Sequence, residues 1–156
     1  MIKKKTLFIL LIAWILVIAS LSTEIGVDSR DRGTQISKII KIYISSSNIT
    51  INHGIDIDDD ILMYIVRKMG HVLVYFVLAL LIHAFLRHTK LSRGKVFIST
   101  IILSLMCACL DEYNQLHVSG RDGTIMDILI DSIGIIGALI VSSTMSQITV
   151  KLSGKT

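Results

Sequence analysis

Apolar residues are concentrated in four long runs that are separated by short polar segments. A helix needs about 20 predominantly apolar residues to cross the hydrocarbon core of a membrane, and each run comes close to that length. The pattern predicts an all-α fold, a polytopic membrane helical bundle that forms a single domain over residues 1–156. Its four transmembrane helices are predicted at about residues 6–22, 69–86, 96–112 and 124–148.

The first apolar run begins after a basic head, Met1–Lys5, and ends among small residues. The same features describe a cleavable signal peptide, so two interpretations stay open at this point. We favour a retained transmembrane helix, because the rest of the chain is also predicted to be embedded in the membrane. The remaining three spans face the same way under either interpretation.

A short amphipathic helix is predicted between the first two spans, because apolar residues there recur with helical spacing. The residues in this repeat are Ile36, Ile39, Ile40, Tyr43 and Ile44. Such a helix lies on the membrane surface, or else packs on the bundle as an ordinary helix. A polar, turn-rich stretch follows at residues 45–54. Asp58, Asp59 and Asp60 then supply an N-cap and favourable charge for a helix that begins near Ile61 and carries the second span.

Composition supports a membrane protein, since 52% of the residues are hydrophobic and the chain contains no proline. That is too apolar for an ordinary soluble domain. The net charge of +4 arises from basic residues in short loops beside apolar runs, which are typical orientation signals of membrane proteins. We therefore expect contact with membrane lipid and no nucleic-acid partner. Cys107 and Cys109 lie two positions apart in an apolar helix and are predicted to be packing residues.

The distribution of lysine and arginine predicts the orientation of the bundle. The head, the loop between the second and third spans, and the tail carry basic residues and no acidic ones. These basic residues are Lys3, Lys4, Lys5, Arg87, Lys90, Arg93, Lys95, Lys151 and Lys155. Because short cytoplasmic loops are enriched in lysine and arginine, both termini are predicted to be cytoplasmic. The acidic residues then lie on the outer side.

Ionisable residues gather at the outer ends of the second, third and fourth spans, where charge is costly to bury and is commonly functional. Lys68, His71 and Tyr75 are spaced i, i+3 and i+7 on the second span and share one helical face. Asp111 lies roughly 24 Å beyond Lys95 at a rise of about 1.5 Å per residue, which places it near the outer boundary of the membrane.

The third and fourth spans add further polar residues at the same depth. Asp111 and Gln115 are spaced i, i+4, with Glu112 beside them. Arg121 occupies a predicted tight turn at residues 119–123. The fourth span carries a stripe of acidic and small residues, which is predicted to bring backbones close and to point two carboxylates into the bundle. The stripe consists of Asp127, Asp131, Gly134, Ala138 and Ser142.

Each of these residues also has a structural explanation when it is taken alone. Lys68 can extend its side chain to the membrane surface, and Tyr75 can belong to an interfacial aromatic belt. Asp111 and Arg121 can form an ion pair that tethers the turn. Together, a lysine, a histidine, a tyrosine, an arginine and four carboxylates at one depth exceed what stability requires, because buried ion pairs seldom repay their desolvation. We therefore predict a functional site at the outer face.

The ordered motifs of this site are similar to those of the VanZ-like family of membrane proteins, over about residues 67–137. The motifs are Lys68-x-x-His71-x-x-x-Tyr75, Asp111-Glu112-x-x-Gln115, Gly120-Arg121, Asp127 and Gly134. The resemblance implies a small protein of the bacterial plasma membrane that is associated with resistance to the glycopeptide teicoplanin. Asp131, Ser119 and His117 depart from the family pattern, which more often has asparagine, proline and an apolar or aromatic residue at these positions.

Two functions from different classes remain open. In the first, the protein is an enzyme that acts on a lipid-linked or peptidoglycan-related substrate of the cell envelope at the outer leaflet. His71 is then the general base, because a histidine beside carboxylates titrates near neutral pH. Asp111 or Glu112 would orient it or act as the acid, and Asp127 completes the predicted catalytic set. The residues predicted to bind the substrate are Lys68, Tyr75, Gln115, Arg121 and Asp131.

In the second, the site binds an anionic lipid head group, a cell-wall precursor or the antibiotic without chemistry, through Lys68, Arg121 and the surface helix. A metal-dependent membrane hydrolase, with a divalent cation on His71 and nearby carboxylates, is a further alternative. We predict no cofactor and no metal, since no two ligands show a familiar spacing such as His-x-x-x-His. No serine or cysteine lies in a recognisable nucleophile motif, so both classes stay open. The other histidines that are assigned no function are His53, His83 and His88.

Overall fold

The computed structural model contains helices and no strand over the residues that it describes, which are 3–24, 26–46, 58–121 and 123–153. Its helices are α1 (Lys4–Ser22), α2 (Gly26–Ser46), α3 (Asp59–Leu86), α4 (Arg93–Gln115) and α5 (Ile125–Ser153). Helices α1, α3, α4 and the part of α5 up to Met145 are long and apolar enough to cross a membrane. The predicted all-α bundle with four candidate spans is therefore confirmed.

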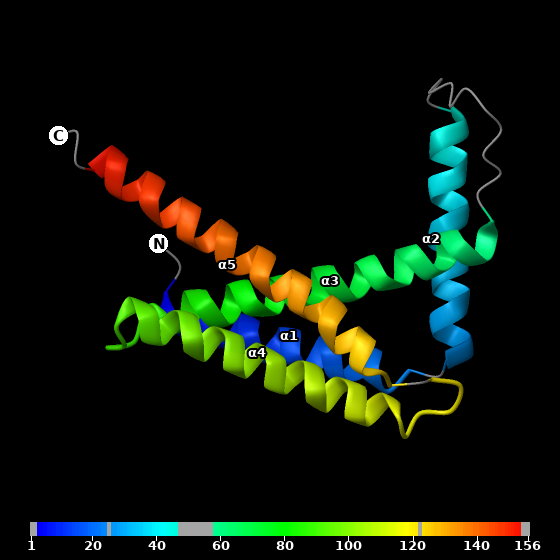
Figure 1. Cartoon of the computed structure of the whole chain (residues 1–156), viewed down its shortest axis with the longest axis horizontal. Helices are drawn as coiled ribbons and strands as arrows, with labels where there is room; N and C mark the ends of the chain where they lie inside the picture. Colours follow the sequence, from blue (N-terminus) through cyan, green and yellow to red (C-terminus); the bar gives the residue numbers. More distant parts are fainter. Residues whose placement is uncertain (1–2, 25, 47–57, 122, 154–156) are drawn as a thin grey trace.

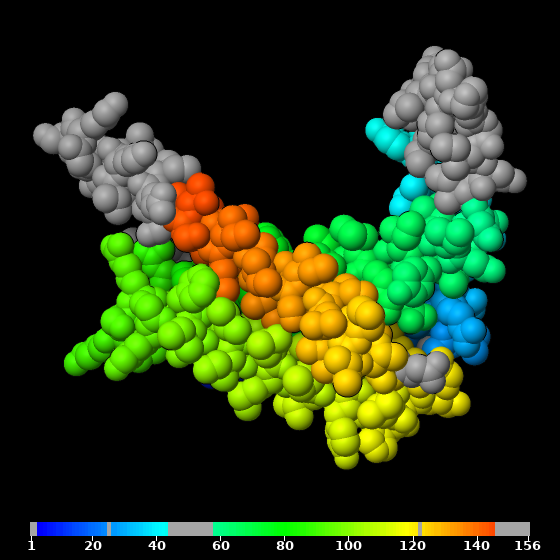
Figure 2. Space-filling model, viewed as in Figure 1, coloured from blue at the N-terminus to red at the C-terminus, as the bar shows by residue number. Residues whose placement is uncertain are grey.

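Helices α1, α3 and α4 lie side by side, and α5 crosses α3 and α4 (Figure 1). The start of α1, the end of α5 and the turn between α3 and α4 lie at one end of the bundle, whereas α2 stands across the opposite end, near the loop between α4 and α5 (Figure 1). Figure 2 shows α5 packed against α4, with the first turns of α3 extending beyond α5 toward α2. Within the described residues, only the end of the bundle near the α4–α5 loop is therefore crossed by an additional helix, α2.

Helix α2 is longer than the predicted surface helix, because it begins at Gly26 rather than near Ile36. Its buried face consists of small residues spaced i, i+4 and i+8, which the apolar periodicity did not reveal. These residues are Ser29, Gly33 and Ser37. Most of the predicted apolar stripe faces away from the bundle, since Ile39 is 65% and Tyr43 is 73% exposed, and lipid can cover it. Residues 47–57, which hold most of the predicted polar stretch, lie outside the described residues.

The start of α3 agrees with the prediction from the aspartate run. Asp58 is the N-cap residue, and its carboxylate accepts a hydrogen bond of 3.0 Å from the backbone amide of Asp60. Asp59 and Asp60 occupy the first turn, where the helix dipole favours negative charge. The starts of the third and fourth spans also lie close to their predicted positions, at Arg93 and Ile125.

A close approach of two backbones joins α3 and α5 at Gly134. A Cβ atom at this position would lie 2.2 Å from the carbonyl oxygen of Val72 and 3.0 Å from the amide nitrogen of Phe76. Glycine permits this contact because it has no Cβ atom. Ala138, one turn further along α5, is 1% exposed and continues the contact surface. The predicted small-residue face of the fourth span is confirmed, and it determines which residues of α3 and α5 face each other.

A hydrophobic core fills the middle of the bundle and separates the two ends. Its members include Ile18, Leu78, Ala79, Ala108, Ile135 and Leu139. Trp14 of α1 adds a polar link, because its indole Nε1 donates a hydrogen bond of 3.0 Å to the carbonyl oxygen of Val74 in α3. All four candidate membrane-spanning helices therefore contribute to one packed interior.

We expect Gly134→Ala to lower the free energy of unfolding by about 1–3 kcal/mol, because the added methyl group must push the Val72 backbone away. Denaturant unfolding of the purified protein in detergent measures this change. Gly137→Ala is the matched control, since its Cβ would make an ordinary contact of 3.5 Å with the Phe76 ring. The free energy of unfolding of Gly137→Ala should stay within about 0.5 kcal/mol of that of the unsubstituted protein. Equal unfolding free energies for the two variants would contradict the close crossing.

Candidate functional site

Two polar side chains of α3 pair with two aspartates of α5. Lys68 forms an ion pair with Asp127, and His71 Nδ1 lies 3.3 Å from Asp131 Oδ1. The two helices run in the same direction (Figure 1). The first residue of the α3 pair therefore meets the first of the α5 pair, and the second meets the second, with spacings of three residues on α3 and four on α5. Both aspartates are buried, Asp131 completely, and a buried charge without a partner is strongly destabilising.

The polar residues of α4 connect this helix to its neighbours. Asp111 Oδ2 accepts a hydrogen bond of 3.0 Å from the hydroxyl group of Tyr75, which is fully buried. Glu112 Oε2 accepts one of 2.9 Å from the backbone amide of Thr124, just before α5 begins. Gln115 is buried one turn beyond Asp111. Helix α4 is thereby joined both to α3 and to the start of α5.

Arg121 ties the loop between α4 and α5 to the first two helices. Its Nη1 donates a hydrogen bond of 2.7 Å to the carbonyl oxygen of Leu21, and its Nη2 donates one of 3.3 Å to Ser29 Oγ. The alternative ion pair with Asp111 is therefore not the contact that holds this loop. Burial and the neighbouring Arg67 lower the pKa of Arg121 from its ordinary value, and the group stays protonated at neutral pH.

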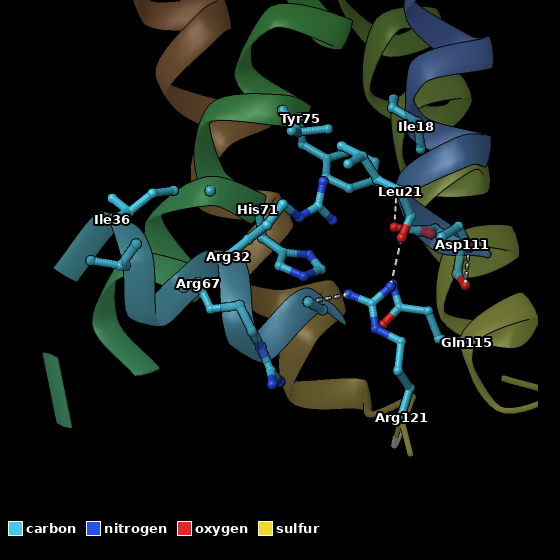
Figure 3. Close-up of a pocket in the computed structure, with 16 residues that line it drawn as sticks. Ile18, Leu21, Arg32, Ile36, Arg67, His71, Tyr75, Asp111, Gln115 and Arg121 are labelled. Atoms are coloured by element: carbon cyan, nitrogen blue, oxygen red, sulfur yellow. Dashed lines mark hydrogen bonds between the residues drawn. The ribbon is translucent and has the colours of Figure 1, made fainter. Parts of the chain in front are cut away.

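A cavity of about 250 Å³ lies between α1, α2, α3 and α4, bounded also by the α4–α5 loop (Figure 3). Figure 3 shows the imidazole of His71 on its wall together with three arginine side chains. The ionisable and amide residues of the wall are Arg32, Arg67, His71, Tyr75, Asp111, Gln115 and Arg121. The aliphatic residues of the wall are Ile18, Leu21, Ile36, Val66 and Val74. The cavity therefore combines an excess of positive charge with an apolar surface.

Arg32 and Arg67 were not among the predicted site residues, although both line the cavity. Arg67 directly precedes Lys68, and Arg32 follows Ser29 at i+3 on α2. These spacings place the two arginines near other site residues on their own helices. They indicate a shared cavity only together with the position of α2 across the end of the bundle. Arg67 Nε is buried and has no hydrogen-bond partner among the described residues.

Several buried carboxylate oxygens also make no hydrogen bond to the described part of the chain. Those among the predicted site residues are Asp111 Oδ1, Glu112 Oε1 and both oxygens of Asp131. The contact between Asp131 and His71 has the distance of an ion pair without the geometry of a hydrogen bond. Ligand atoms of His71, Glu112 and Asp131 all lie within 4.8 Å of one another, which is an arrangement that can hold a metal ion.

The residues predicted to form the site all lie at the end of the bundle that α2 crosses. They are Lys68, His71, Tyr75, Asp111, Glu112, Gln115, Arg121, Asp127 and Asp131. Their catalytic and binding roles remain predictions. The structure differs in the partner of His71, which is Asp131 rather than Asp111 or Glu112. One oxygen of Asp111 accepts a hydrogen bond from Tyr75, and one of Glu112 accepts a hydrogen bond from Thr124. His83 lies apart from the site, 3.5 Å from the hydroxyl group of Thr100.

The sequence profile of the VanZ/LLP1 family matches residues 6–146. The chain therefore belongs to this family, as its motifs indicated. The match runs from the start of α1 into the last turns of α5, so it includes every residue of the site. No curated protein and no solved structure matches the chain.

We expect Asp127→Asn to lower the free energy of unfolding by about 3 kcal/mol, because it leaves Lys68 largely buried without its counter-charge. Adding Lys68→Met should recover most of this loss, since a neutral pair carries no uncompensated charge. Denaturant unfolding of both single variants and of the double variant gives the coupling energy. Lys95→Met, at an exposed position, is the control. A coupling energy below about 0.5 kcal/mol would show that the pair contributes no more than a surface salt bridge.

Proposed function

We propose that this VanZ/LLP1-family protein binds an anionic, lipid-linked ligand of the bacterial cell envelope at the outer face of the plasma membrane. Binding of such a ligand would link the protein to the teicoplanin resistance with which its family is associated. The observation that supports this function is the cavity, which three arginine residues and several aliphatic residues line.

A ligand that suits this cavity combines an anionic group with a hydrocarbon chain. Arginine binds phosphate and carboxylate through paired N–H donors in a planar fork. Ile18, Leu21 and Val74 offer a surface on which the first carbons of a chain can pack. Pockets for whole drug-sized ligands measure about 300–1,000 Å³, so a cavity of about 250 Å³ holds a head group while the rest of the chain stays in the membrane.

Arg67 is the best placed of the three arginines to bind the anionic group. Its Nε has no hydrogen-bond partner among the described residues, and a buried donor in that state costs about 1–3 kcal/mol. Arg121 already donates hydrogen bonds to Leu21 and Ser29. Arg32 forms an ion pair with Glu24. An anion beside Arg67 would satisfy the unpaired donor, while the other two arginines add positive charge.

Hydrolysis of the same ligand is a second candidate function, because His71 lines the cavity with Asp131 beside its Nδ1. A carboxylate in this position orients an imidazole that acts as a general base. The cavity serines are engaged elsewhere, since Ser22 Oγ donates to the carbonyl oxygen of Asp111 and Ser29 Oγ accepts from Arg121. Water is therefore the nucleophile that this arrangement favours.

The binding function is tested with two ligands that differ only in their head group, a polyprenyl phosphate and the polyprenyl alcohol of the same chain length. We expect the protein in detergent to bind the phosphate at least tenfold more tightly, as measured by native mass spectrometry. Arg67→Gln should remove most of this preference, because it deletes the unpaired cationic donor. Arg87→Gln, at the opposite end of α3, is the matched control and should keep it. Equal affinities of the unsubstituted protein for the two ligands would rule out this function.

In cells, Arg67→Gln should lower teicoplanin tolerance, whereas Arg87→Gln should leave it unchanged. Membrane abundance of both variants is measured in parallel, so that loss of protein is distinguished from loss of function. Unchanged teicoplanin tolerance with Arg67→Gln would show that resistance does not depend on ligand binding in the cavity.

The proposed location of the site at the outer face predicts a labelling pattern in intact cells. With Cys107 and Cys109 replaced by alanine, a cysteine introduced at Ser119 should react with a membrane-impermeant thiol reagent. A cysteine introduced at Ser92, which is also exposed but lies in the loop at the other end of the bundle, should not react. The reverse pattern would place the site on the cytoplasmic side.

A further inference from the structure

We propose that His71, Glu112 and Asp131 form a binding site for a divalent metal ion. They come from α3, α4 and α5, and their ligand atoms all lie within 4.8 Å of one another. Ligands that share one ion at distances of about 2.0–2.2 Å are roughly 3–4.3 Å apart. Small side-chain rotations therefore bring the three groups into one coordination sphere. This site stands independently of the lipid-linked ligand proposed above.

Unpaired buried oxygens supply separate evidence that a cation belongs here. Asp131 is 0% and Glu112 is 4% exposed, yet Asp131 Oδ2 and Glu112 Oε1 have no hydrogen-bond partner among the described residues. A buried acceptor without a partner costs about 1–3 kcal/mol, and a charged one costs more. A single cation between these two carboxylates would satisfy both.

Among the described residues, positively charged side chains pair directly with only part of this cluster. Four carboxylates are buried together near the start of α5, those of Asp111, Glu112, Asp127 and Asp131. Lys68 pairs with Asp127, and the nearby Arg121 donates its hydrogen bonds to Leu21 and Ser29. A protonated His71 would balance Asp131 but would leave Glu112 Oε1 without a partner. A divalent cation offsets the charge of both carboxylates, with His71 neutral as its nitrogen ligand.

The chemistry of the ligands favours a transition metal. Magnesium and calcium prefer sites made entirely of oxygen ligands, whereas imidazole suits zinc and iron. One imidazole with two carboxylates is a mixed set that Mn²⁺ and Zn²⁺ both accept. These two ions are therefore the ones to test.

His71 belongs both to this cluster and to the wall of the cavity. A bound ion would therefore lie where the buried carboxylates meet the cavity. It would occupy a nitrogen of the imidazole, so His71 would be a ligand and not a general base. In the hydrolytic function considered above, metal-bound water would then take the place of water activated by histidine.

Metal binding is measured on the full-length protein, purified in detergent, treated with a chelator and then supplied with Mn²⁺ or Zn²⁺ alone. We expect at least one of these ions to bind at one per chain and to raise the Tm. Glu112→Gln and Asp131→Asn should each weaken binding at least tenfold, because each removes a charged ligand. His83→Ala removes a histidine from the other end of the same helix and should bind as the unsubstituted protein does.

A spectroscopic measurement identifies the nitrogen ligand directly. With bound Mn²⁺, electron spin echo envelope modulation should show a coupled nitrogen that disappears in His71→Ala and persists in His83→Ala. These measurements need neither the lipid ligand nor turnover. A negative result would therefore argue against the metal site without arguing against the proposed lipid-binding function. No binding of either ion to the unsubstituted protein, or equal affinity in Glu112→Gln, would overturn the metal site and leave His71 and Asp131 as an ion pair.

Discussion

The contact between the backbones of α3 and α5 at Gly134 is the constraint on which the rest of the site depends. Because the helices meet there without an intervening side chain, any larger residue at this position would push them apart. The approach places Lys68 opposite Asp127 and His71 opposite Asp131. A slip of one residue would turn each aspartate by about 100° around the helix axis and separate both pairs.

The end of the bundle that α2 crosses has two parts with different character. Helices α3, α4 and α5 bury the carboxylates, while α1, α2 and the α4–α5 loop complete a cavity with arginines on its wall. His71 belongs to both parts, because its ring lines the cavity and its Nδ1 faces Asp131. An anionic ligand on the arginine side and a cation on the carboxylate side would therefore be separated by one imidazole.

Much of this arrangement could be predicted from helical spacing alone. The shared face of Lys68, His71 and Tyr75 and the stripe of small and acidic residues on α5 follow from a period of 3.6 residues, and the structure joins them. The partner of His71 could not be predicted, because four carboxylates lie at the same depth and only the crossing point of the helices selects among them. The arginine wall was missed for a related reason. Arg32 contributes to the cavity only because the small residues of α2 pack on the bundle, and a pattern search for apolar periodicity does not detect such a face.

The pairing of α3 with α5 also has a consequence for how the protein is made. Synthesis proceeds from the N-terminus, so α3 is made before the segment that carries both of its aspartate partners. Until α5 arrives, Lys68 must keep its charge at the membrane surface, because an unpaired ammonium group is costly in hydrocarbon. The carboxylates that pair with Lys68 and His71 inside the bundle are therefore available only once the fourth span has been made.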